Sequence, residues 1–149
     1  MPLKSRRGAA FGDVSNTGNI DIVVLNVGEP PSVLLNTNRT PFHRVLFKLI
    51  GTKSNRAAIG ARVTIRAGGV KQFSEVRGGG SYLSQNDLRL HFGLGAAKKI
   101  ESVEIRWPNG TTETLQNLPA DAIYTIVEGS GIRDTKPLPP PGAVPTARQ

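Results

Sequence analysis

The sequence predicts an all-β protein whose main unit is an antiparallel β-sandwich. Short stretches of alternating apolar and polar residues dominate the 149-residue chain, and long helical patterns are few. Glycine (17 residues) and proline (11 residues) supply frequent turns between these stretches. About eight or nine short strands, paired in sequence order, favour two packed antiparallel sheets over a helical or α/β fold.

The first 41 residues predict a small hairpin-like unit ahead of the sandwich. The segment "FGDVSNTGNIDIVVLN" (Phe11–Asn26) combines a polar turn with an apolar strand candidate at Asp21–Asn26. A second strand candidate, Ser32–Asn36, follows the turn-forming residues "VGEPP". We therefore expect a boundary near residue 41.

Residues 42–130 carry the alternation that predicts the sandwich itself. In "GARVTIRAGG", for example, Ala61, Val63 and Ile65 fall on one face, and Gly68-Gly69 suits a hairpin turn. The other strand candidates are "HRVLFKLIG", "VKQFSEVR", "DLRLHFGLG", "ESVEIRWPNG", "TTETLQNL" and "AIYTIVEG". Residues 131–149 are proline-rich without an apolar period, which predicts an extended, polyproline-like or disordered tail.

The bulk composition limits the function classes. The chain has no cysteine, which excludes disulfides, thiolate metal sites and cysteine nucleophiles. The net charge of +8 allows nucleic-acid binding, but the basic residues are spread along the chain and aromatic residues make up only 5%. No apolar run approaches the roughly 20 residues of a membrane span, and the first residues lack the pattern of a signal peptide.

The turn after Phe11 has the spacing of a calcium loop. Oxygen-bearing side chains alternate around Gly18, and their register is Asp13, Ser15, Thr17, Asn19 and Asp21. Ca²⁺ takes oxygen ligands, and its affinity depends on the number of carboxylates. Hydroxyls stand at two of the expected acidic positions, so the sequence leaves two alternatives: a weak Ca²⁺ site, or an Asx-type turn in which the side chains of Asp13 and Asn16 bond to backbone amides.

No arrangement typical of catalysis is visible, and we expect the chain not to be an enzyme. His43 and His91 stand alone, and His91 falls on the polar face of a strand, which predicts a surface or edge histidine. The segment "RGGGSYLSQND" lacks the lysine and the helix of a phosphate loop and predicts a wide loop.

Three blocks of sequence resemble one known family. "SNRAAIGARVTIRAGG" (Ser54–Gly69), "GGGSYLSQNDLRLHFGLG" (Gly78–Gly95) and "VEIRWPNG" (Val103–Gly110) occur in the order and spacing of the ASPIC/UnbV domain. The resemblance covers roughly Phe42–Glu128, and Ala10–Asn38 resembles the FG-GAP (integrin-α-like) repeat that precedes this domain within a β-propeller.

The resemblance implies a binding module of an exported or surface protein, and the C-terminal piece of a longer one. A single repeat cannot close a propeller, so we expect it to pack on the sandwich or to be poorly ordered. A protein or glycan partner would be bound through exposed polar and aromatic loop residues: Asn55, Arg56, Tyr82, Ser84, Gln85 and Asn86. The alternatives are a carbohydrate-binding sandwich, with Tyr82, Tyr124 and Trp107 as candidate aromatics, and a nucleic-acid-binding basic domain.

Overall fold

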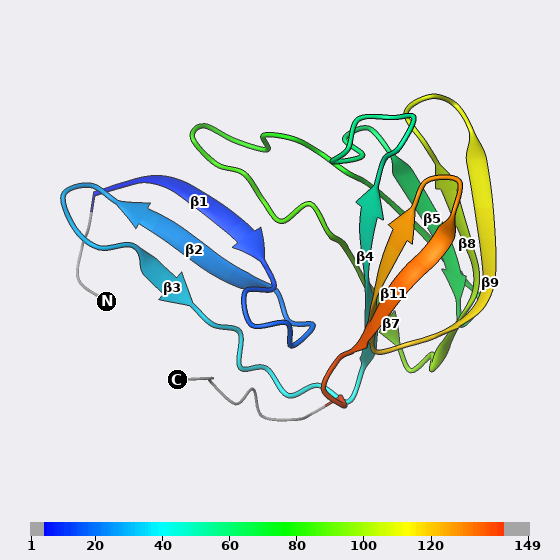
Figure 1. Ribbon diagram of the computed structural model, residues 1–149. Helices are drawn as coiled ribbons and strands as arrows, with labels where there is room; N and C mark the ends of the chain where they lie inside the picture. Colours follow the sequence, from blue (N-terminus) through cyan, green and yellow to red (C-terminus); the bar gives the residue numbers. More distant parts are fainter. Residues whose placement is uncertain (1–4, 142–149) are drawn as a thin grey trace.

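The computed structural model describes residues 5–141, and within this range the chain is all-β (Figure 1). An N-terminal sheet has the order β1-β2-β3, built from β1 (Arg6–Gly12), β2 (Asp21–Asn26) and β3 (Ser32–Leu34). The two sheets of the sandwich have the orders β11-β10-β4-β7 and β6-β5-β8-β9. Their strands are β4 (His43–Ile50), β5 (Arg62–Ala67), β6 (Val70–Glu75), β7 (Leu90–Gly95), β8 (Lys99–Arg106), β9 (Thr112–Pro119), β10 (Ala122–Val127) and β11 (Gly131–Pro137).

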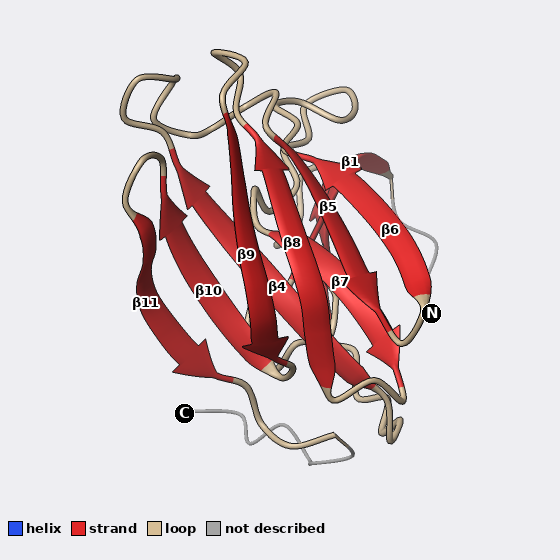
Figure 2. Cartoon of the chain, turned by 90° about the vertical axis from the view of Figure 1, so that its right-hand side faces the viewer, coloured by secondary structure: helices blue, strands red, loops and turns tan. Residues whose placement is uncertain are grey.

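The two sheets of the sandwich form two stacked layers (Figure 2). The predicted alternation places apolar side chains between these layers, where they form the core. Val63 and Ile65 of β5 and Val103 and Ile105 of β8 are all fully buried. The opposite sheet contributes Phe47, whose ring packs against those of Phe92 and Tyr124 at 5.9 Å between centroids. Side chains of a strand alternate between the two faces of a sheet, so one face of each sheet is apolar and the other is polar.

The tail predicted for residues 131–149 is wrong for its first part. Gly131–Pro137 forms β11, which pairs antiparallel with β10, and Leu138 is buried beside Leu46 and Ile123. The side chains of β11 are almost all exposed, so this edge strand carries no apolar period and is defined by main-chain pairing. Proline can end such a strand because an edge leaves one row of N–H groups unused. Residues 142–149 lie outside the described part of the chain.

The strand connections are not all of the antiparallel kind expected for neighbours in sequence. β10 lies between β11 and β4 and pairs with β4 in parallel, with Tyr124 opposite Phe47. Parallel neighbours need a crossover, and here the chain crosses to the second sheet and back twice between β4 and β10, with β7 in between. The remaining strand pairs are antiparallel.

The N-terminal sheet lies beside the sandwich and has no apolar core of its own. Neither hydrophobic cluster contains a residue of β1, β2 or β3. The sheet also includes a strand, β1, that the alternation did not predict, because Arg6–Gly12 contains two glycines and no regular pattern. The N-terminal sheet nevertheless packs on the sandwich (Figure 1). Packing was one of the two outcomes expected for this unit.

Candidate functional site

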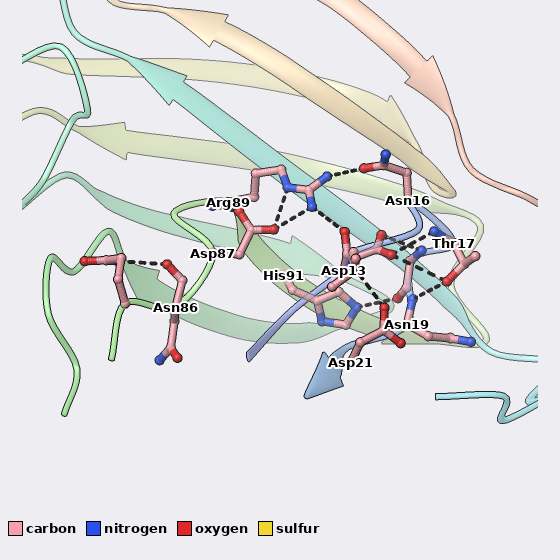
Figure 3. A network of polar contacts seen from close by, with 12 residues as sticks. Asp13, Asn16, Thr17, Asn19, Asp21, Asn86, Asp87, Arg89 and His91 are labelled. Atoms are coloured by element: carbon pink, nitrogen blue, oxygen red, sulfur yellow. Dashed lines mark hydrogen bonds and ion pairs between the residues drawn. The ribbon is translucent and has the colours of Figure 1, made fainter. Parts of the chain in front are cut away.

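The turn between β1 and β2 is built around two buried carboxylates (Figure 3). Asp13 and Asp21 are each only 1% exposed. Their four oxygens accept backbone N–H groups, at distances of 2.7–3.0 Å, from Val14, Thr17, Gly18 and Asn36. These contacts are those of the Asx-type alternative, although Asp21 takes part with Asp13 where Asn16 was expected.

The other residues of the predicted calcium register lie in the same turn. The Thr17 hydroxyl oxygen is 3.5 Å from a carboxylate oxygen of Asp13 and accepts the N–H of Asn19 at 3.4 Å. The Asn19 amide donates to two backbone carbonyls, and Ser15 is exposed. Among residues 5–141 no cluster of three or more His, Cys, Asp or Glu side chains could hold a metal. The donor set therefore contains two carboxylates, both already bonded to amides.

Three basic side chains attach this turn to the outer face of the sheet β11-β10-β4-β7. Arg89 donates to the Asp13 carbonyl at 2.7 Å and to the Asn16 side chain at 2.6 Å (Figure 3). The Nε2 atom of His91 lies 2.8 Å from the Gly18 carbonyl oxygen. Because a carbonyl only accepts, this hydrogen bond requires a proton on Nε2. Arg44 donates to the Thr17 carbonyl. The polar turn thus reaches the sandwich through its backbone oxygens.

His91 lies on the outer face of the edge strand β7, as predicted, and the N-terminal turn that it contacts partly covers it. Burial lowers its pKa, while the bond to Gly18 and the nearby Asp13 oppose that shift and Arg44 adds to it. Gly18 itself has φ +81°, and a Cβ there would lie 2.2 Å from Arg44 Nε. Glycine is therefore needed at the centre of the turn for its conformation and for the close approach of Arg44.

The loop at residues 77–87 runs along the free edge of β1. The Ser84 hydroxyl accepts the Ala9 N–H at 3.1 Å, and the Asn86 side-chain oxygen accepts the Phe11 N–H at 3.0 Å. The Phe11 carbonyl accepts the Asp87 N–H at 2.9 Å. Two predicted partner-binding residues, Ser84 and Asn86, thus occupy the hydrogen-bonding edge of β1, as a neighbouring strand would.

The tip of this loop is fixed by hydrogen bonds within the loop, while two of its side chains are exposed to solvent. Gln85 accepts the Gly79 N–H at 2.7 Å and donates to the loop backbone. Ser81 and Ser84 form an isolated antiparallel bridge around Tyr82 and Leu83, which are both 68% exposed. Of the four residues predicted in this loop, Tyr82 alone projects from it with most of its side chain free.

Asn55 and Arg56 lie in the loop that follows β4. The Asn55 side chain both donates to and accepts from the Ile59 backbone, at 2.9 Å in each case. It closes its own loop, as expected for a structural residue. The exposed Arg56 side chain lines a cleft on the sandwich.

The same loop holds a buried carboxylate, Glu128, that the sequence did not indicate. One Glu128 oxygen accepts the consecutive N–H groups of Thr52, Lys53 and Ser54 at 2.8–2.9 Å. The other accepts the Ser54 hydroxyl at 3.0 Å and the Asn109 amide at 2.6 Å. Desolvation raises the pKa of Glu128, but these hydrogen bonds favour the anion more strongly and lower the pKa to about 2.

Among the described residues, His43 and Asp121 form a histidine–carboxylate pair. His43 Nδ1 is 2.6 Å from Asp121 Oδ2, and the Asp121 carboxylate also lies 3.7 Å from Arg44. The pair joins the start of β4 to the turn before β10. Neither His43 nor Asp121 lines the cleft described next.

A cleft of about 1570 Å³ lies between the N-terminal turn and the outer face of the sheet β11-β10-β4-β7. Residues 14–17 form one wall, and Lys48, Ile123 and Thr125 of the central strands lie on the other. Its lining contains five basic side chains: Lys48, Arg56, Arg89, Arg133 and Lys136. The sequence could not have predicted this cleft, because it requires the N-terminal unit to pack on one particular face.

The described residues contain no helix that could cross a membrane. No curated protein matches the chain. The family described as ASPIC and UnbV matches residues 51–133, more than half of the chain and the part that contains strands β5 to β10. The match includes the Asn55 loop, the loop at residues 77–87 and Glu128, whereas β4 and the N-terminal sheet precede it. The chain therefore belongs to the ASPIC and UnbV family.

Proposed function

We propose that this chain is a non-enzymatic binding module of an extracytoplasmic protein, which engages a protein or glycan partner through its loops. Proteins of the family are generally extracellular, which supports the location. The observation that carries the proposal is the displayed pair Tyr82 and Leu83, each 68% exposed at the tip of an anchored loop. Tyrosine is enriched among the residues that dominate binding energy at interfaces, and Leu83 adds exposed apolar surface beside it.

The loop tip is rigidly presented. The Ser84 hydroxyl donates to the Tyr82 carbonyl at 3.0 Å while it accepts from β1, so the turn is fixed on both sides. Leu83 has φ +48°, a conformation that costs energy for a branched side chain. Strain of this kind clusters at binding sites, and a pre-ordered tip loses little entropy when it binds.

The test is binding to protein and glycan arrays by the wild type and by Tyr82→Ala and Leu83→Ala. We expect the wild type to bind one component and each variant to lose about tenfold or more in affinity, as for interface anchors. Val70→Ala is the matched control, because Val70 is also a 56% exposed apolar residue but lies on β6, away from the loop tip. A partner that binds both loop variants as well as the wild type would contradict the proposal.

The carbohydrate-binding alternative loses its aromatic platform in this fold. Of its three candidate residues, Trp107 is 1% and Tyr124 is 3% exposed. Tyr82 remains, so a glycan partner would have to be bound through this one aromatic residue and neighbouring polar groups. The glycan arm of the array addresses that alternative directly.

We further propose a weak Ca²⁺ site at the N-terminal turn. Asp13 and Asp21 would supply the two charges, and Ser15, Thr17 and Asn19 are the neutral oxygen donors nearby. Because both carboxylates already accept amide N–H groups, we expect affinity no better than millimolar. Calorimetry at millimolar Ca²⁺, with Asp13→Asn as the control, would show heat in the wild type alone. No heat in the wild type would leave the turn without a metal.

A further inference from the structure

The cleft beside the N-terminal turn is strongly cationic. Lys48, Arg56, Arg133 and Lys136 are exposed in its lining, and none of them forms an ion pair with another residue of the described chain. Asp134 is the one acidic residue that could offset them, since Asp87 is paired with Arg89. Four uncompensated cations thus face one free carboxylate across a concave surface, which focuses a positive potential there.

The strand register concentrates this charge on the floor of the cleft. On the outer face, one row across the sheet runs Asp134, Thr125 and Lys48. Arg89, which comes just before β7, also lines the cleft but is paired with Asp87. Lys136 lies one row away, opposite Ile123.

A β-bulge adds the third cation. The pairing of β10 with β11 shifts between Thr125 and Ile126, which leaves Arg133 as an extra residue on β11. Simple alternation would place Arg133 and Asp134 on opposite faces, yet both line the cleft. Bulges commonly redirect a side chain in this way near binding sites. The bulge thus gives the cleft a positive charge that a regular strand would have directed elsewhere.

The polar groups of the opposite wall indicate what kind of anion fits. Ser15 and Asn16 are exposed there, and the Asn16 amide N–H₂ remains available because its oxygen alone accepts from Arg89. Hydroxyls and amides suit the hydroxyl groups of a sugar. The lining contains no aromatic residue, so it offers no surface on which a nucleic-acid base could stack.

From these features we propose that the cleft binds an anionic oligosaccharide, whose sulfate or carboxylate groups lie against Lys48, Lys136, Arg133 and Arg56. Ser15, Asn16 and Thr125 hydrogen-bond the sugar hydroxyls. This site is separate from the Tyr82 loop and does not depend on it. The repulsion among these four cations is then a cost in stability that the bound anion offsets.

The test measures the affinity of the full chain for two probes, a sulfated hexasaccharide and a uronate hexasaccharide that carries carboxylates alone. The binding variant is Lys48→Gln/Lys136→Gln, and the control is Lys71→Gln/Lys99→Gln, which removes the same charge from β6 and β8 of the other sheet. Isothermal calorimetry over a series of salt concentrations gives both the affinity and its salt dependence.

We expect the wild type to bind at least one of the two saccharides at about 0.15 M salt, and the binding variant to lose about tenfold or more in affinity. Its logarithmic salt slope should fall by about two, as expected for two lost contacts with anionic groups. The control should change less than about threefold. The melting temperature of the binding variant should be unchanged or raised, because repulsion among the cations that line the cleft is reduced.

Three outcomes would overturn the proposal. The first is no binding of either saccharide by the wild type. The second is an equal loss of affinity in the binding variant and the control, which would indicate attraction by net charge alone. The third is tighter binding of single-stranded DNA or polyglutamate than of the saccharides. Tyr82→Ala should leave saccharide affinity unchanged, so failure here is distinguishable from failure of the loop function.

Discussion

At the scale of single residues, the Glu128 carboxylate stands out in the sandwich because it accepts five hydrogen bonds. Its carboxylate joins three parts of the chain: the loop after β4, the turn at Asn109, and the end of β10. Consecutive backbone N–H groups form a concave anion site, and here the occupant is the protein's own side chain. A buried carboxylate with this many donors should stabilise the fold as long as it stays ionised.

The first prediction concerns Glu128→Gln. Gln offers one oxygen and a donor N–H₂ to a site built from donors, so at least one buried group is left unsatisfied. We expect the melting temperature at pH 7 to fall by roughly 5–10 °C. Glu104→Gln removes the same charge from an exposed position and should change it by less than about 2 °C.

The contribution of Glu128 to stability depends on pH. The pKa of Glu128 is lowered to about 2 in the folded chain, against about 4.3 for an unperturbed Glu. Its contribution is therefore complete above about pH 4.3 and is lost as the pH falls toward 2. The difference in melting temperature between wild type and variant should shrink over that range. A difference that stays constant down to pH 2.5 would show that the charge plays no part.

At the scale of elements, strands with two well-defined faces could be predicted from the sequence and the others could not. Arg62–Ala67 and residues 102–106 of β8 alternate, because one face is core and the other is solvent. β11 is an exposed edge with no apolar face, and β1 contains glycines that have a steric purpose. A Cβ at Gly8 would lie 2.9 Å from the Ser84 hydroxyl oxygen, so this glycine admits a loop whose position no local pattern reveals.

The second prediction tests whether the C-terminal strand belongs to the sandwich. Leu138 follows β11, is 6% exposed and packs with Leu46 and Ile123. Leu138→Ala should lower the free energy of unfolding by about 2–3 kcal/mol, as for other buried leucines. Leu35→Ala is the matched control, because Leu35 is 53% exposed and its truncation should cost less than about 0.5 kcal/mol. Urea unfolding would measure both values.

Equal effects of these two substitutions would mean that the segment after β10 is only an appendage. A larger effect of Leu138→Ala would place the end of the sandwich beyond residue 130, where the proline-rich composition suggested that it stops. Composition was misleading here because main-chain pairing, together with one buried leucine, is enough to hold an edge strand.

At the scale of the whole molecule, the N-terminal sheet is held mainly by hydrogen bonds. No residue of β1, β2 or β3 belongs to either apolar cluster. The hydrogen bonds that join the sheet and its turn to the sandwich and its loops come from Arg44, Ser84, Asn86, Asp87, Arg89 and His91. Each such bond contributes only about 0.5–1.5 kcal/mol net. We therefore expect the sheet to open more readily than the sandwich unfolds.

These contacts also explain why the candidate sites were only partly predictable. The turn at Asp13 to Asp21 closes on itself and could be predicted from local spacing. The cleft joins residues more than 70 positions apart in sequence, such as Arg89 and Asn16. Nothing in the periodicity of a strand records which loop will cover its polar face, so the cationic floor looked like scattered surface charge.

The last prediction is that acid weakens the attachment of the N-terminal sheet through His91. Burial lowers the pKa of His91 in the attached state, so the detached state binds more protons. Protection is therefore complete above the unperturbed pKa of about 6.5 and declines as the pH falls below it, by at most tenfold per pH unit for one group. Hydrogen exchange of residues 11–26, corrected for intrinsic rates between pH 5 and 7.5, measures this protection.

Two variants of the same chemistry separate His91 from the rest of the molecule. Gln at position 91 keeps an N–H donor for the Gly18 carbonyl and cannot titrate, so His91→Gln should flatten the decline between pH 6.5 and 5. His43→Gln is the matched control, because His43 contacts Asp121 at the start of β4 and not the N-terminal turn. If the decline persists in His91→Gln or disappears in His43→Gln, His91 is not the group that controls attachment. If it behaves as expected, the attachment of one wall of the cleft depends on pH through one imidazole, because residues 14–17 form that wall.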